Sequence, residues 1–346
     1  MKRRNDILIL ICVCLLGSVG CSTAYHKTQS EETKNTKIRI GLSVDSFLLE
    51  RWQREKDIFI SKAQELGAEV NVQDANGDID QQIAQIEYLI DAKMDVITII
   101  PIASDALTNV VKKAKRVGIK VIAYDRIVTN ANVDLYISFD NKKVGELMAK
   151  NLIESVPKNG NVLMICGPLT DNNVLQVTER FEEVVNKSKL NIIDKVYVEQ
   201  WVPEKAFALT NEKLRSAYTI DGIMCGNDSF AGQAIRALAE RRLAGAVSVV
   251  GQDADVEACQ RIVEGTQNMT VYKPVDELAR KAAEYAVNLA NGELIDVFDK
   301  FFDGAFEVPY EKLEPIPVTK KNMDKAIIEE GFHLKEDVYL NVYNNQ

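Results

Sequence analysis

Short apolar segments and amphipathic segments of helical period alternate along most of this chain, and this alternation limits the possible folds more than any other feature. In the first half, strands are predicted at 38–44, 69–73, 95–100 and 120–125, with helices at about 47–66, 79–93 and 105–117 between them. Gly67 and Gly118 stand where glycine commonly ends a helix. Strands that alternate with helices form parallel sheets with helices on both faces, so we expect an α/β fold.

The alternation starts again after Tyr136–Asp140. Strands are predicted at 161–166, 192–198, 221–225 and 247–251, with helices at about 142–155, 173–187, 204–217, 230–242 and 254–264. Two βα series of similar size predict two lobes, and the lack of a long linker predicts a close hinge that the chain crosses more than once.

A further strand at 269–272 and a helix at about 275–291 could return to the first lobe. We therefore expect lobe 1 to comprise 37–140 with 273–300, and lobe 2 to comprise 141–272 with 301–333. Residues 334–346 would form a tail.

The amino terminus has the layout of an export signal. Lys2, Arg3 and Arg4 precede an apolar run, Ile7–Leu16, which is followed by small residues and then Cys21. A cysteine at this place resembles the lipoprotein cleavage box, in which the thiol receives the lipid. Ser18 departs from that box, so an uncleaved membrane anchor within residues 1–21 is the alternative. Residues 22–36 are polar and aperiodic, which predicts a flexible tether to the outer face of the cell membrane.

Charge and cysteine content exclude several classes of protein. Removing residues 1–20 takes away three basic residues and one acidic residue, so the net charge goes from −9 to −11. An acidic surface argues against nucleic acid as a partner. Cys166, Cys225 and Cys259 remain, an odd number in apolar surroundings, which favours buried free thiols. No metal-ligand spacing is present, and we expect neither a metal nor a cofactor.

Polar and aromatic residues recur where the predicted strands end. In open α/β sheets, ligands bind outside the carboxyl ends of the strands, so these residues are candidates for one site. Carboxylates, amides and guanidinium groups suit the hydroxyls of a sugar, and aromatic faces suit its C–H groups. The candidates are Arg51, Trp52, Asp125, Arg126, Asp171, Asn172, Asn173, Trp201, Asn227, Asp228, Gln252, Asp253 and Lys273.

Structural explanations stay open for several of these residues. Asp125 and Arg126 could form an ion pair that ends a strand, Asn173 and Asp228 could be helix N-caps, and the tryptophans could be ordinary packing residues. Asp253 and Asp255 could in principle support glycoside chemistry, but Asp255 opens a predicted helix, which favours a capping role.

Motifs for other chemistry are missing from the sequence. No strand is followed by a GxGxxG or GxxxxGK[ST] phosphate loop, and there is no GxSxG elbow or plausible histidine partner for a nucleophile. These absences argue against an enzyme.

Short motifs are spread over nearly the whole predicted folded part, from about residue 38 to 333. They are Leu49–Gln53, Asn76–Gly77, Ile100–Pro101, Ala123–Arg126, Tyr136–Asn141, Val144–Glu146, Asp171–Asn173, Gly226–Asp228, Gly251–Asp255, Gly265–Gln267, Met269–Pro274 and Gly331–His333. Together they resemble the motifs of the D-xylose-binding proteins of the periplasmic sugar-binding superfamily, and the sequences ERW, YDR, DNN, GQDAD and VYKP are specific to the xylose branch.

This resemblance implies two Rossmann-like lobes of the type I periplasmic binding protein fold, a three-strand hinge and a pentopyranose in the cleft. It implies a sugar site of Arg51, Trp52, Asp125 and Arg126 from the first lobe, Asp171, Asn173, Trp201, Asn227 and Asp253 from the second, and Lys273 at the hinge. Trp52 and Trp201 would sandwich the ring, and Asp125 could serve only to orient Arg126.

Two membrane partners fit such a protein: the permease of a sugar-importing ABC transporter, or a LytS-like histidine kinase for which the protein is a xylose sensor. The chain departs from transport-type relatives in a shorter segment between Asp171 and Trp201, with Tyr197 where a second tryptophan often stands. We therefore expect the sensor, with the importer as the alternative. A sugar-responsive repressor core is a remote third reading, against which the export signal argues.

Overall fold

The computed structural model describes residues 37–47, 50–216 and 219–342. The leader, Cys21 and the tether lie outside the described residues. Within the described ranges, no helix has the length and apolar character needed to cross a bilayer.

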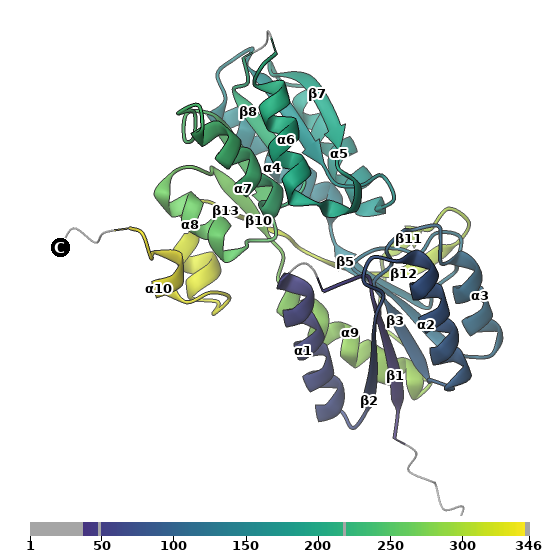
Figure 1. Cartoon of the computed structure of the whole chain (residues 1–346). Helices are drawn as coiled ribbons and strands as arrows, with labels where there is room; N and C mark the ends of the chain where they lie inside the picture. Colours follow the sequence, from purple (N-terminus) through teal and green to yellow (C-terminus); the bar gives the residue numbers. More distant parts are fainter. Residues whose placement is uncertain (1–36, 48–49, 217–218, 343–346) are drawn as a thin grey trace, which may run out of the picture. The chain divides into compact units, whose positions relative to one another are not determined.

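The first lobe is built on a seven-stranded sheet in the order β11-β12-β5-β4-β3-β1-β2 (Figure 1). All neighbouring strands are parallel except β11, which pairs antiparallel with β12. The strands are β1 (Arg39–Val44), β2 (Glu69–Asp74), β3 (Val96–Ile99), β4 (Lys120–Tyr124), β5 (Leu135–Phe139), β11 (Lys300–Phe302) and β12 (Glu307–Leu313).

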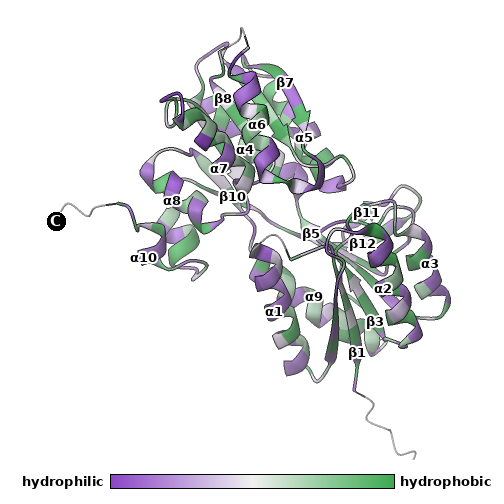
Figure 2. Cartoon of the chain, viewed as in Figure 1, coloured by the Kyte–Doolittle hydropathy of each residue, from purple (hydrophilic) through white to green (hydrophobic). Residues whose placement is uncertain are grey.

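Helices cover both faces of this sheet. One hydrophobic cluster joins its strands to α1 (Glu50–Glu65) and α9 (Val275–Ala290), and a second joins them to α2 (Ile79–Asp91) and α3 (Thr108–Arg116). Figure 2 shows the corresponding pattern, with hydrophobic strands and helices that carry hydrophilic stretches. Gly67 and Gly118, which follow α1 and α3, have φ of 85° and 88°, a left-handed conformation that glycine adopts without steric cost.

The second lobe is built on a six-stranded sheet in the order β13-β10-β9-β8-β6-β7, in which only β13 is antiparallel to its neighbour. Helices α4 and α5 pack on one face and α6 and α7 on the other. The strands are β6 (Asn161–Cys166), β7 (Asn191–Tyr197), β8 (Gly222–Cys225), β9 (Ser248–Gln252), β10 (Met269–Tyr272) and β13 (Ile316–Val318). The helices are α4 (Asn141–Ser155), α5 (Asn172–Val185), α6 (Pro203–Lys213), α7 (Asp228–Ala239) and α8 (Val256–Glu264), with a short 3₁₀ turn at Glu199–Trp201.

The chain passes between the two sheets three times: between β5 and α4, between β10 and α9, and between β12 and β13. The predicted α/β fold with two lobes and a three-strand hinge is therefore confirmed. The carboxyl ends of β1 and β4 and those of β6, β8 and β9 lead into the loops that carry the polar residues singled out above.

One boundary drawn from the sequence is wrong. Residues 301–313 were expected in the second lobe, but β12 pairs in parallel with β5 and extends the first sheet. The Tyr310 ring stacks on the Tyr136 ring at 4.7 Å between centroids, and Tyr310 Oη donates to the Phe139 carbonyl at 2.8 Å. The chain returns to the second sheet only at β13.

The end of the described chain packs against the fold. A π-helical turn at Asp324–Ile328 and the short helix α10 (Lys335–Val338) follow β13. Val338 is fully buried, and Gln260 Nε2 of α8 donates to the Asp337 carbonyl at 2.8 Å. The segment predicted as a tail is thus attached to α8 at least as far as this helix.

Candidate ligand-binding site

A pocket of about 510 Å³, open space at its mouth included, lies where the loops after both sheets meet. Both lobes contribute side chains to it. Its lining includes every residue predicted for the site, namely Arg51, Trp52, Asp125, Arg126, Asp171, Asn173, Trp201, Asn227, Asp253 and Lys273. Sequence positions more than 200 residues apart are therefore brought to one place by the fold.

Asp125 follows β4 and has a left-handed backbone with φ of 61°, which is uncommon for a residue with a side chain. Its carboxylate accepts a hydrogen bond from Arg51 Nη2 at 2.8 Å. Burial raises the pKa of Asp125, but the charges of Arg51, Lys273 and Arg126 outweigh burial, so the pKa is lowered overall. The residue is therefore a carboxylate at neutral pH.

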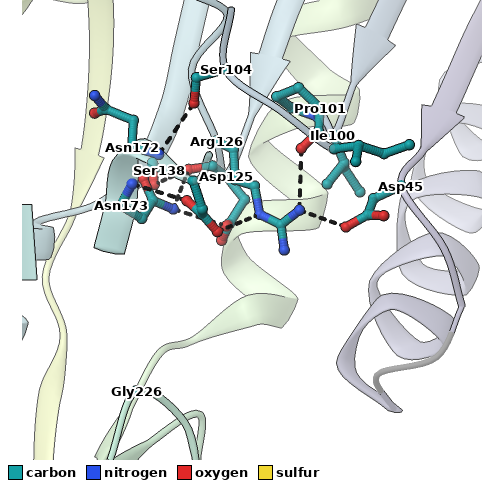
Figure 3. A network of polar contacts seen from close by, with 12 residues as sticks. Asp45, Ile100, Pro101, Ser104, Asp125, Arg126, Ser138, Asn172, Asn173 and Gly226 are labelled. Carbon is teal, nitrogen blue, oxygen red and sulfur yellow. Dashed lines mark hydrogen bonds and ion pairs between the residues drawn. The ribbon is translucent and has the colours of Figure 1, made fainter. Parts of the chain in front are cut away.

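The Asp125 backbone carbonyl is a hydrogen-bond centre as well. It accepts from Ser138 Oγ at 2.6 Å and from Asn173 Nδ2 at 3.0 Å (Figure 3). It also accepts from Tyr136 Oη at 3.2 Å. Because Asn173 belongs to the second lobe, these bonds fix the end of β4 against the start of α5.

Arg126 joins three segments of the chain. Its Nη1 donates to Asp45 Oδ2 at 2.6 Å and to the Pro101 carbonyl at 3.1 Å (Figure 3). Its Nε pairs with Asp171 Oδ2 at 2.9 Å. Burial lowers the pKa of the guanidinium, but the carboxylates of Asp171 and Asp45 raise it by more. Burial raises the pKa of Asp171, and the positive charge of Arg126 offsets this rise only in part.

Two expectations about this pair are therefore corrected. Asp125 does not orient Arg126, and in the part of the chain that the structure describes no ion pair joins their side chains. The ion-pair partner of the Asp125 carboxylate is Arg51 from α1, and the ion-pair partners of Arg126 are Asp45 and Asp171.

In the second lobe, polar residues begin helices at the pocket. Asn227 is the N-cap of α7, where its Oδ1 accepts from the Phe230 amide at 2.9 Å, and Asp171 caps α5 by accepting from the Asn173 amide at 2.9 Å. Capping was the alternative explanation for Asp228 and Asn173. The N-cap residues are instead Asn227, one place before Asp228, and Asp171, two places before Asn173.

Asp253 and Lys273 form the side of the pocket next to the hinge. Asp253 follows β9 with φ of 100°, and its Oδ1 lies 3.2 Å from Lys273 Nζ and 3.6 Å from Arg51 Nη1. Asp255 stands at the N-cap of α8 as expected, but its side chain makes no capping hydrogen bond among the described residues.

The two tryptophans come from different lobes. Trp52 is almost fully buried beside two guanidinium groups, with Arg51 and Arg126 at 4.2 Å and 5.6 Å from its ring centroid. Trp201 has a left-handed backbone and packs on Phe230 at 5.5 Å between centroids. A Cβ atom at Gly167 would lie 2.2 Å from the Trp201 ring, so this approach requires glycine.

Sequence reasoning did not select every residue of the site. Gln252, a candidate that the predicted ten-residue sugar site leaves out, lines the pocket, and Asp45, which was not a candidate, supports Arg126. Within residues 37–47, 50–216 and 219–342, Gln252 Oε1 and Trp201 Nε1 are buried atoms without a hydrogen-bond partner. The rule that selected the other residues, polar groups just after a strand, would have found Asp45 after β1.

The described ranges hold no group of three or more histidine, cysteine, aspartate or glutamate side chains placed to bind a metal ion. The pocket instead combines hydrogen-bond donors and acceptors of both charges with two aromatic rings, which is the chemistry of a site for a small polyhydroxylated ligand.

Comparison with known proteins agrees with this description of the fold. Residues 40–294 match the family model described as "Periplasmic binding protein domain". The chain is 42% identical over 330 residues to the D-xylose-binding periplasmic protein of Haemophilus influenzae, covering 94% of this chain and 98% of that protein. It is 41% identical over 346 residues to the D-xylose-binding periplasmic protein of Escherichia coli, covering 98% of this chain and 100% of that protein.

Among solved structures, the chain is similar to an ABC transporter solute binding protein from Clostridium phytofermentans with bound β-D-glucose. The TM-score is 0.78 at 26% identity, over 87% of this chain and 99% of that one.

These matches define a two-lobed binding protein. The chain belongs to the periplasmic binding protein family. Its relatives are sugar-binding periplasmic proteins, so it is a binding protein and not an enzyme.

Proposed function

We propose that this chain is an extracytoplasmic D-xylose-binding protein that delivers the sugar to an ABC importer. The observation that carries the proposal is that all ten predicted residues, from both lobes, line one pocket. The full-length similarity to two D-xylose-binding periplasmic proteins supports xylose as the ligand.

Each group in the pocket has a role that follows from its chemistry. Arg51 and Lys273 donate to sugar hydroxyls, Asp253 accepts from them, and Asn227 donates through Nδ2 because its Oδ1 already caps α7. The unpaired Trp201 Nε1 and Gln252 Oε1 gain partners when a polyhydroxylated ligand enters. Trp52 and Trp201 cover the two apolar faces of the pyranose ring.

Ligand that touches both lobes favours the closed arrangement, and a membrane partner recognises that arrangement. The sequence favoured a LytS-like histidine kinase as this partner, with the permease as the alternative. We now prefer the permease, because the C. phytofermentans structure is described as an ABC transporter protein and the two xylose-binding relatives match the chain along almost its whole length. Attachment through Cys21 or an uncleaved anchor would hold the protein near either partner.

Intrinsic fluorescence tests the ligand directly, since the chain has only two tryptophans and both line the pocket. Titration with D-xylose should change the emission in a saturable way, and Trp52→Phe and Trp201→Phe should each remove part of the change. A panel of pentoses and hexoses that leaves the emission unaltered would contradict the proposal.

The partner is tested by pull-down from membranes that carry a candidate permease or a candidate kinase, with and without xylose. Retention of the permease that depends on xylose supports the importer. Retention of the kinase alone would restore the sensor reading.

A further inference from the structure

Glu55 is a buried carboxylate just behind the pocket, and it is not part of the lining. It lies on α1 one turn after Arg51 and is 2% exposed. A carboxylate this deep is stable only where its oxygens are paired, so its partners indicate what it does.

Both oxygens of Glu55 are used within the first lobe. Oε1 accepts from Arg51 Nε at 2.6 Å, and Oε2 accepts from the hydroxyl of Tyr124. Tyr124 is the last residue of β4 and directly precedes Asp125. Glu55 therefore connects α1 to the strand end that carries the acidic partner of Arg51.

The guanidinium of Arg51 uses a different nitrogen for each acidic neighbour. Nη2 donates to Asp125, and Nη1 lies 3.6 Å from Asp253, both of which line the pocket. A ligand hydroxyl can compete for these two nitrogens. It cannot compete for Nε, because Glu55 is outside the lining, so the bond to Glu55 persists when the other partners exchange.

We propose that Glu55 is a positioning residue for the ligand site, whose carboxylate holds the Arg51 guanidinium in the orientation that a bound sugar requires. The inference rests on the proposed function for the identity of the sugar. The inference adds Glu55, which does not touch the ligand, as the residue that orients Arg51, which does.

The electrostatic surroundings make this role sensitive to pH. Burial raises the pKa of Glu55 to about 7, and the negative charge of Asp125 also raises it. Arg51 and the Tyr124 hydroxyl lower this pKa, but by less. Helix α9 packs against α1, the helix that carries Glu55. Asp276 and Glu284 of α9 pair with Arg54 and Lys62 of α1 and not with Glu55. Protonated Glu55 loses its charge-assisted bond to Arg51, so sugar affinity should fall as the pH drops below about 7.

The test is calorimetric titration with D-xylose between pH 5.5 and 8.5. One linked proton gives a limiting slope of about tenfold in affinity per pH unit, so the wild type should lose roughly tenfold or more over this range. Glu55→Gln should bind several-fold more weakly at pH 8.5 and show a much flatter profile. Asp228 in the second lobe, whose pKa burial raises to about 7, is present in both proteins, so their difference isolates Glu55.

Glu146→Gln is the matched control. Glu146 also pairs with an arginine, Arg180, at 2.6 Å, but it lies away from the pocket on α4, and its hydrogen bonds to Lys150 and Arg180 lower its pKa to about 2. This variant should keep the wild-type affinity and the wild-type profile.

A second variant covers the case in which Glu55→Gln fails to fold. Tyr124→Phe keeps the carboxylate but removes a donor that stabilises its charge, so the fall in affinity should move to higher pH. Wild-type affinity and profile in both variants would overturn the inference while leaving the proposed function intact. Absence of xylose binding by the wild type at every pH would overturn both.

Discussion

Replacing Arg126 by lysine keeps a positive charge between the lobes but removes the planar fork that reaches two carboxylates. Arg126 is 4% exposed and bonds to Asp45 at 2.6 Å, to Asp171 at 2.9 Å and to the Pro101 carbonyl at 3.1 Å. An ammonium group is a point charge on a flexible chain and cannot occupy the Nε and Nη1 positions together. One carboxylate is therefore left without its partner.

The size of the effect follows from which bond is lost. Asp171 is 3% exposed, and an unsatisfied buried group costs about 1–3 kcal/mol, against about 3–5 kcal/mol when a buried charge loses its whole partner. We expect Arg126→Lys to lower the free energy of unfolding by about 1–3 kcal/mol. Because the Arg126–Asp171 bond joins the two lobes at the pocket, xylose affinity should fall by a similar free energy, roughly 5- to 150-fold in Kd.

Urea unfolding followed by circular dichroism measures the first quantity, and calorimetric titration measures the second. Arg116→Lys is the control, since Arg116 is an exposed residue of α3, where substitution should change the free energy of unfolding by less than about 0.5 kcal/mol. If Arg126→Lys matches this control in both measurements, the ion-paired arginine is not the connection between the lobes that its distances indicate.

Two further substitutions test the second lobe. Gly167→Ala places a Cβ atom 2.2 Å from the Trp201 ring and should displace it at a cost of about 1–3 kcal/mol in unfolding free energy, with weaker xylose binding; unchanged stability and affinity would mean that the ring is not fixed there. Asp228 is fully buried and accepts from Gln267 Nε2 and Thr270 Oγ1, and burial raises its pKa to about 7, so the folded state holds the proton more tightly than the unfolded state between pH 4 and 7. Its contribution to stability therefore falls as the pH rises through that window. Asp228→Asn should flatten this pH dependence in urea unfolding from about pH 4 to 8, whereas an unaltered slope would assign the dependence to other groups.

The strands and helices around the site follow from local patterns, which explains why the sequence predicts them. Segments such as β4 and β6 are continuous apolar runs because both faces of a parallel sheet are covered, and Asp171 and Asn227 begin helices as N-cap residues commonly do. Polar residues after such strands converge at one edge, so all ten residues of the predicted sugar site reach the same pocket.

The errors concern features that depend on contacts between distant segments. Strand β12 is placed by its pairing with β5 and by Tyr310 stacking on Tyr136, and no local pattern in 301–313 shows which sheet it joins. The partner of Asp125 is Arg51, 74 residues earlier, although Arg126 is its neighbour in sequence. The left-handed backbone of Asp125 accompanies this arrangement, and such a conformation is rarely encoded by the residue itself.

The role of Glu55 does not follow from the sequence alone. It stands four residues after Arg51 on a predicted helix, a spacing that places the two side chains on one face. Surface pairs at this spacing are common and contribute little, so the sequence alone gives no reason to prefer this one. Only the burial of Glu55 and its bond to Tyr124 distinguish it.

The central claim is that the pocket between the lobes binds D-xylose. Both sheets and the described hydrophobic clusters lie within Lys37–Gln346, which forms one compact unit, so this fragment is suitable for calorimetric titration with D-xylose, glucose, ribose and arabinose. The account predicts tight binding of D-xylose with one site per chain and much weaker binding of the other three sugars. Absence of binding to all four, or a clear preference for a sugar other than xylose, would contradict it.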